Sequence, residues 1–114
     1  MKYLLLVCWD AEKMNADDEP TRTEEPESFP WLDDLQARNA WIIGDQVAAP
    51  KRARSVQVRG GRTLVTDGPF ADTKEAVGGF DVIEAGSLDE AVEIAAGHPV
   101  AAFGTIEVRQ LLGS

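Results

Sequence analysis

Residues 3–9 read Tyr-Leu-Leu-Leu-Val-Cys-Trp, and this run decides the fold. Successive side chains of a strand point to opposite faces, and here both faces are apolar: Leu5 and Val7 share one, Leu4 and Leu6 the other. Such a strand must be covered on both sides. The run is far shorter than the roughly 18 residues that span a bilayer, and no small-residue cleavage site follows it. We therefore interpret it as a strand and predict no membrane partner.

The composition of the chain bounds its class. With 114 residues, 44% of them hydrophobic and 27% charged, it is typical of one globular domain, residues 1–114. A formal net charge of −9 argues against direct binding to nucleic acid, whose phosphates require a basic surface. A single cysteine, Cys8, and a single histidine, His98, offer neither a disulfide framework nor a metal-ligand spacing. We predict a cytoplasmic protein without a metal or a cofactor.

The pattern after the first strand predicts a loop, a helix and a second strand. Residues 10–28 carry eight acids and two prolines with little apolar content, which indicates a mobile loop with at most one helical turn. A helix follows from residue 28 or 29, where proline suits the first turn, to about Asn39, and it buries Leu32 and Leu35. Residues 41–43 then form a strand.

Two adjacent glycines mark a hairpin in the middle of the chain. Gly60 and Gly61 separate β-like runs at residues 55–59 and 62–66, and primed hairpin turns require positive φ. Residues 50–66 also contain five bases and no acid: Lys51, Arg52, Arg54, Arg59 and Arg62. This basic window is either a solvated hairpin face or a docking patch for an anion or for the acidic part of another subunit.

The last third of the chain predicts a strand, a helix and a strand. Residues 80–84 and 105–110 are the strands, and Ser87 with Glu90 forms a capping box where the helix begins. Gly97 is placed to end the helix. The spacing i, i+3, i+4 and i+7 predicts one buried stripe, made of Leu88, Ala91, Val92 and Ala95.

This order of elements predicts an α+β protein. A βαβ unit, a hairpin and a second βαβ unit give a ferredoxin-like split βαβ topology, with an antiparallel sheet and both helices on one face. Two helices cover only one face, so the other apolar face of the first strand stays exposed. A second copy that packs sheet against sheet would bury it. We therefore expect a homodimer through the sheet face.

Residues 67–75, Asp-Gly-Pro-Phe-Ala-Asp-Thr-Lys-Glu, resemble the DGPFAETKE signature of the YCII-related (DGPF domain) family. Asp72 stands where that family has a glutamate. The similarity extends roughly over residues 1–9 and 40–112, including the opening and closing strands. It implies a ferredoxin-like fold that pairs into a dimeric α+β barrel, in agreement with the order of the elements.

The resemblance says less about activity. Members of the family are similar to small dimeric enzymes of the muconolactone-isomerase type, and some are joined to or encoded beside extracytoplasmic-function sigma factors. Several relatives carry a histidine in the first helix, whereas residues 31–39 contain none, so a His–Asp pair using that histidine cannot be carried over. Fold similarity alone does not assign a reaction.

The signature is also where polar side chains gather. Its first aspartate suits a turn, and the following proline fixes the backbone so that Phe70 can bury its ring. Asp72 or Thr73 can cap a short helical turn that includes Glu75. The signature is either a structural turn at the rim of the barrel or part of a ligand site. The ligand-binding candidates are Asp67, Phe70, Thr73, Lys74, Glu75 and Gly79.

Asp67 and His98 are the candidate catalytic residues. His98 follows the last helix, where it either stabilises the helix terminus as a cation or acts as a general acid or base beside a carboxylate, with Asp67 and Glu107 as candidates. Cys8 lies between apolar neighbours in a strand, so we expect it to pack and not to react.

Two classes of function follow. In the first, the protein binds or transforms a small metabolite in a cavity between sheet and helices, rimmed by the signature turn; whether it is an enzyme stays open. In the second, it is a non-catalytic interaction or regulatory module whose partner is a transcription factor such as an extracytoplasmic-function sigma factor. An enclosed pocket with convergent polar side chains would favour the first class, and a broad exposed contact patch the second.

Overall fold

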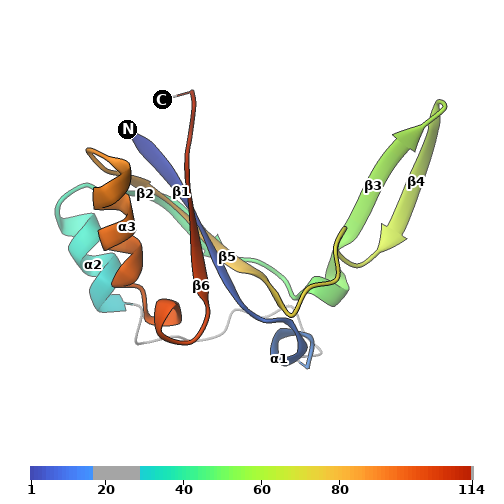
Figure 1. The fold of residues 1–114 in the computed structure, drawn as a ribbon, viewed down its shortest axis with the longest axis horizontal. Helices are drawn as coiled ribbons and strands as arrows, with labels where there is room; N and C mark the ends of the chain where they lie inside the picture. The colour runs from blue at the N-terminus through green and yellow to red at the C-terminus, as the bar shows by residue number, and fades with distance from the viewer. Residues whose placement is uncertain (17–28, 114) are drawn as a thin grey trace.

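A four-stranded antiparallel sheet forms the centre of the molecule (Figure 1). The computed structural model describes residues 1–16 and 29–113. In sheet order the strands are β2 (Trp41–Gln46), β5 (Glu75–Glu84), β1 (Lys2–Asp10) and β6 (Thr105–Gln110). In the described part of the chain, two α-helices lie between β1 and β2, and one α-helix lies between β5 and β6. The topology is therefore ferredoxin-like, as the sequence predicted.

The helical segments are all short. Within residues 1–16 and 29–113 they are α1 (Ala11–Asn15), α2 (Phe29–Ala37), α3 (Leu88–Ala96) and the 3-10 turns η2 (Pro50–Arg52) and η3 (Pro99–Ala102). The predicted cap of α3 is present, because the Ser87 hydroxyl oxygen accepts from the Glu90 N–H at 3.1 Å. The Glu90 carboxylate reaches back to accept from the Gly86 N–H at 3.0 Å.

The core lies between the sheet and helices α2 and α3. Tyr3 and Leu5 of β1 share a face with Ile83 of β5, because Tyr3 lies opposite Ile83 in the antiparallel register. These side chains are buried with Leu35 of α2 and Ile94 of α3. One of the two apolar faces of β1 is thus covered by helices of the same chain.

The other face of the sheet carries apolar side chains that α2 and α3 do not cover. Leu4 lies opposite Val82 and Leu6 lies opposite Phe80, so these four side chains share that face. All four are only partly buried, and Ile43 of β2, which also pairs with Val82, is about half exposed. We call these five residues the open sheet face.

The predicted hairpin is present as a separate two-stranded sheet, β3 (Arg54–Arg59) and β4 (Arg62–Asp67). It projects away from the end of the main sheet, and we call residues 54–67 the arm (Figure 1). Gly60 and Gly61 have φ of 58° and 76°, the positive values that a primed turn requires. The radius of gyration is 15.7 Å, against about 13 Å for a compact chain of this length.

The predicted buried stripe on α3 is wrong in two positions. Leu88 and Val92 are about half exposed, whereas Ile94 is buried together with Ala91 and Ala95. The two alanines allow the helix to approach the sheet closely. The rotation that buries the larger Ile94 turns Leu88 and Val92 outward.

Two strands extend beyond their predicted bounds by three residues or more. β2 continues beyond residue 43, because Gly44 fits beside Asp81 of the neighbouring strand where a side chain would collide. β5 begins at Glu75, five residues before the expected start. Of the predicted mobile loop, residues 10–16 form the end of β1 and α1, and residues 17–28 lie outside the described residues.

Candidate functional site

The signature turn lies between β4 and β5, at the end of the sheet away from α2 and α3 (Figure 1). Asp67 forms an ion pair with Arg54 at 3.1 Å between carboxylate Oδ1 and guanidinium Nε. Gly68 follows with φ of 91°, a value that favours glycine. The Phe70 ring is 84% exposed, so the expectation that it is buried is wrong within one chain.

Residues 73–75 of the signature form hydrogen bonds that hold the start of β5 in place. The Thr73 hydroxyl donates to the Glu75 carbonyl oxygen. The Glu75 carboxylate accepts from the Thr105 hydroxyl at 2.8 Å, and the Lys74 carbonyl accepts from the Ala11 N–H at 3.0 Å. Glu75 therefore belongs to a strand, and the expected helical turn capped by Asp72 or Thr73 is not formed.

Gly79 lies apart from the other ligand-binding candidates. A Cβ at this position would lie 3.1 Å from the carbonyl oxygen of Asp45 on β2, so the glycine permits close approach of two strands. A strand rises about 3.3 Å per residue, which puts Gly79 roughly 13 Å from Glu75 along β5. The structure thus divides the candidate set into the exposed segment 67–75 and one glycine in the middle of the sheet.

His98 is buried and has a different role from the one expected at a helix terminus. Its Nδ1 accepts from the Val100 N–H at 3.0 Å, which caps η3, and its ring packs edge-on against Trp31 with centroids 4.8 Å apart. Burial lowers the pKa of His98, which disfavours the cation. The expected cationic interaction with the helix dipole is therefore not supported. The carboxylate of Asp67 is bound to Arg54 and that of Glu107 to Arg109.

Sequence reasoning missed Asp81, a partly buried carboxylate on the covered face of the sheet. Asp81 lies opposite Leu5 on β1, and its Oδ1 accepts from the Trp41 indole N–H at 2.9 Å. Burial raises the pKa of Asp81 to about 6, and the hydrogen bond from Trp41 opposes that rise. A carboxyl group that titrates near neutral pH can both give and take a proton.

The backbone around Asp81 leaves room for its side chain. Gly44 lies directly opposite Asp81, and a Cβ on Gly44 would collide with the Asp81 carboxylate and lie 2.6 Å from the Phe80 carbonyl oxygen. One sequence signal could have found this residue. Asp81 falls in the same alternation as Ile83, so it occupies a core-facing position of β5 where an acid is unusual.

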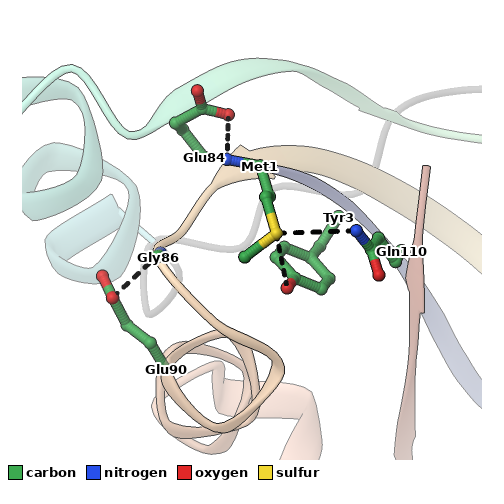
Figure 2. A network of polar contacts seen from close by, with 6 residues as sticks. All are labelled: Met1, Tyr3, Glu84, Gly86, Glu90 and Gln110. Carbon is green, nitrogen blue, oxygen red and sulfur yellow. Dashed lines mark hydrogen bonds and ion pairs between the residues drawn. The ribbon is translucent and has the colours of Figure 1, made fainter. Parts of the chain in front are cut away.

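A hollow of about 330 Å³ lies at the opposite end of the sheet from the signature. It is lined by Met1, Arg38, Asn39, Ala40, Glu84, Ala85, Gly86 and Glu90. The amino group of Met1 lies 3.6 Å from the Glu84 carboxylate. The Tyr3 hydroxyl and the Gln110 side-chain amide both contact the Met1 sulfur (Figure 2). Glu84 pairs with the Met1 amino group and Glu90 accepts from the Gly86 N–H, so both acids that line the hollow are already engaged.

Cys8 is half-buried, and its surroundings oppose reaction. Burial is the main cause that raises the pKa of Cys8, followed by the nearby carboxylates of Glu107 and Glu75, so little thiolate forms. Within residues 1–16 and 29–113, no three His, Cys, Asp or Glu side chains come together in a group that could hold a metal ion. In the same part of the chain, no helix has the length and apolar character needed to cross a membrane.

Comparison with known proteins gives a family and one relative. The model of the YCII-related domain matches residues 1–113. An uncharacterised protein of Rhizobium meliloti (strain 1021) is 44% identical over 61 residues, which cover 52% of this chain and 49% of that protein. The matched segment thus spans about half the length of that relative.

Proposed function

The chain belongs to the YCII-related family, and we propose that it is a homodimer that binds or transforms a small metabolite between its sheet and its helices. Asp81 is the acid–base group of this proposed site, and Trp41 holds it by the hydrogen bond at 2.9 Å. The observation that carries the proposal is the Asp81 carboxyl, whose pKa burial raises to about 6 on the covered face of the sheet.

Physical chemistry supports Asp81 as a ligand group. In its protonated form the Asp81 carboxyl donates a hydrogen bond to a carbonyl or carboxylate oxygen, and in its ionised form it accepts a proton from a ligand. Trp41 adds a flat apolar surface beside it. Small carboxylates and phenolic or lactone metabolites combine an apolar body with such oxygens, and they are the compounds we expect to bind.

The signature turn enters the proposal as a second ligand-contacting region. Asp67, Phe70 and Lys74 are exposed and offer an acid, an aromatic ring and an ammonium group. Six residues of extended strand separate Glu75 from Asp81, about 20 Å. A small ligand therefore contacts either Asp81 or the turn of the same chain, and it contacts both only when a second chain brings its own turn to the site.

The test is a thermal-shift screen of these metabolites against the wild type and four variants: Asp81→Asn, Asp67→Asn, Lys74→Ala and the matched control Asp33→Asn, on the exposed face of α2. We expect at least one compound to stabilise the wild type, by about 2.7 kcal/mol at a concentration of 100 times Kd. Asp81→Asn should abolish this shift, and Asp33→Asn should retain it. If Asp67→Asn or Lys74→Ala abolishes it instead, the ligand lies at the signature turn. A screen without any shift contradicts the proposal.

The exposed apolar side chains favour a second candidate, the interaction module. Phe70 and the valines of the arm present hydrophobic surface that one chain leaves in water. A purified extracytoplasmic-function sigma factor should then bind, and Phe70→Ala should weaken that binding in calorimetric titration. This result together with an empty metabolite screen would replace the first proposal by the second.

A further inference from the structure

One face of the arm carries three valines that the described part of the chain leaves exposed. Val56 lies opposite Val65 and Val58 opposite Thr63, so the three valines share a face of the hairpin. Each is 58–61% exposed. Gln57 belongs to the opposite face, because neighbouring residues of a strand alternate.

Contacts between its two strands close the base of the arm. The Gly68 N–H donates to the Ala53 carbonyl oxygen at 2.8 Å, and the Ser55 hydroxyl donates to the Gly68 carbonyl oxygen, also at 2.8 Å. The ion pair between Arg54 and Asp67 closes the same end. A lone two-stranded hairpin is marginally stable in water, and apolar contact on one face is what stabilises it.

The distribution of charge along the chain favours a second copy of the chain as the partner that contacts the arm. Residues 54–67 of the arm contain three bases and one acid, whereas the rest of the chain contains eight bases and 19 acids. The edge strand β2 and the residue that follows it offer a matching surface, since Ile42, Ile43 and Val47 are exposed there around the acidic Asp45. A basic hairpin with an apolar face fits an acidic edge with apolar side chains.

The size of the open sheet face points the same way. Four strands about 4.8 Å apart, two of them roughly 20 Å and two roughly 30 Å long, present a projected area of about 500 Å². A stable interface of standard size buries about 800 Å² of each partner. The arm adds apolar area beyond the sheet.

We infer that the valine face of the arm packs on the β2 edge of a second copy, and that this contact stabilises the dimer. This inference rests on the proposed homodimer and adds to it a contact that sheet-on-sheet packing does not require. Because a two-fold dimer repeats every contact, each chain gives one arm and receives one.

The test compares Val56→Asp with Gln57→Asp, which introduces the same residue and charge change on the other face of the same strand. Sedimentation equilibrium should show a dimer Kd raised about a hundredfold or more by Val56→Asp, because an unpaired charge would be buried in the contact. Gln57→Asp should change it by less than about threefold. Val56 is exposed in the single chain, so circular dichroism of Val56→Asp should match the wild type.

A second measurement uses the unmodified protein, because Val56→Asp could weaken the dimer by unfolding the hairpin and not by disrupting the contact itself. Amide hydrogen exchange in residues 54–67 should slow when the concentration rises above the dimer Kd. If the protein is dimeric but exchange there does not depend on concentration, and Val56→Asp dimerises normally, the arm inference fails while the sheet-face dimer stands. If Leu4→Asp on the open sheet face has no effect and Val56→Asp dissociates the dimer, the sheet-face contact fails instead. A monomeric wild type overturns both the sheet-face dimer and the arm contact. The metabolite screen tests the proposed ligand site independently of these two contacts.

Discussion

Asp81 links protonation to stability at the scale of a single residue. Burial raises its pKa from 3.8 to about 6, so the folded chain keeps this proton to a higher pH than the unfolded chain does. Ionisation of Asp81 therefore costs stability: the cost is small below about pH 4, grows up to about pH 6 and is complete above it. Asp81→Asn keeps an oxygen for Trp41 and removes the charge. We expect it to raise the free energy of unfolding by about 1–3 kcal/mol at pH 7.5, after allowance for solvent access, and to change it little at pH 4.

Urea unfolding of the wild type and of Asp81→Asn at the two pH values measures this effect. Asp33→Asn is the matched control, because Asp33 is exposed and loses one charge in the same way. A difference between wild type and Asp81→Asn that is equal at both pH values would show that the carboxyl group has no raised pKa.

At the scale of single residues, sequence reasoning succeeded where the order of residues is specific. It failed where the three-dimensional surroundings of a side chain decide its character. It selected the segment 67–75 because the order of its residues is specific, and the family match over residues 1–113 includes that segment. It missed Asp81, whose character depends on Trp41 and Gly44, about 40 positions away in the chain. It also expected a buried Phe70, because burial depends on what packs around a turn and not on the turn itself.

At the scale of elements, local signals located the helices, strands and the hairpin, but packing decided their orientation. Gly60 and Gly61 predicted the hairpin turn, and Ser87 predicted the start of α3. The direction of a helix face is settled by tertiary contacts that no local window contains. That is why the rotation of α3 about its axis was predicted wrongly.

The rotation of α3 predicts a difference between two truncations on the same helix. Ile94→Ala should lower the free energy of unfolding by about 2–4 kcal/mol, because Ile94 is buried in the core and leaves a cavity. Val92→Ala should cost less than about 1 kcal/mol, because Val92 is half exposed. Urea denaturation measures both, and equal costs would mean that α3 buries the stripe predicted from the sequence.

At the scale of the whole molecule, the order of elements predicted the ferredoxin-like topology, since short connections and antiparallel pairing leave few alternatives. The two-sided apolar pattern of residues 3–9 predicted that one face of the sheet stays uncovered within the chain. The projection of the arm was not predicted, because the pattern of a hairpin does not say whether it joins the main sheet. Among the described strands, β3 and β4 pair only with each other.

The open sheet face gives the last prediction, the homodimer. Light scattering at micromolar concentration should report twice the chain mass of 12.4 kDa. Leu4→Asp should give the single-chain mass, because Leu4 lies on the open sheet face and an aspartate there would be buried without a partner. Leu112→Asp is the matched control, since Leu112 is exposed near the end of the described chain, and it should stay dimeric. The structure also separates Leu4 from Leu5, which is buried against the helices, so Leu5→Asp should unfold the chain itself. A wild type of single-chain mass, or a Leu4→Asp variant of unchanged mass, would place the interface elsewhere or remove it.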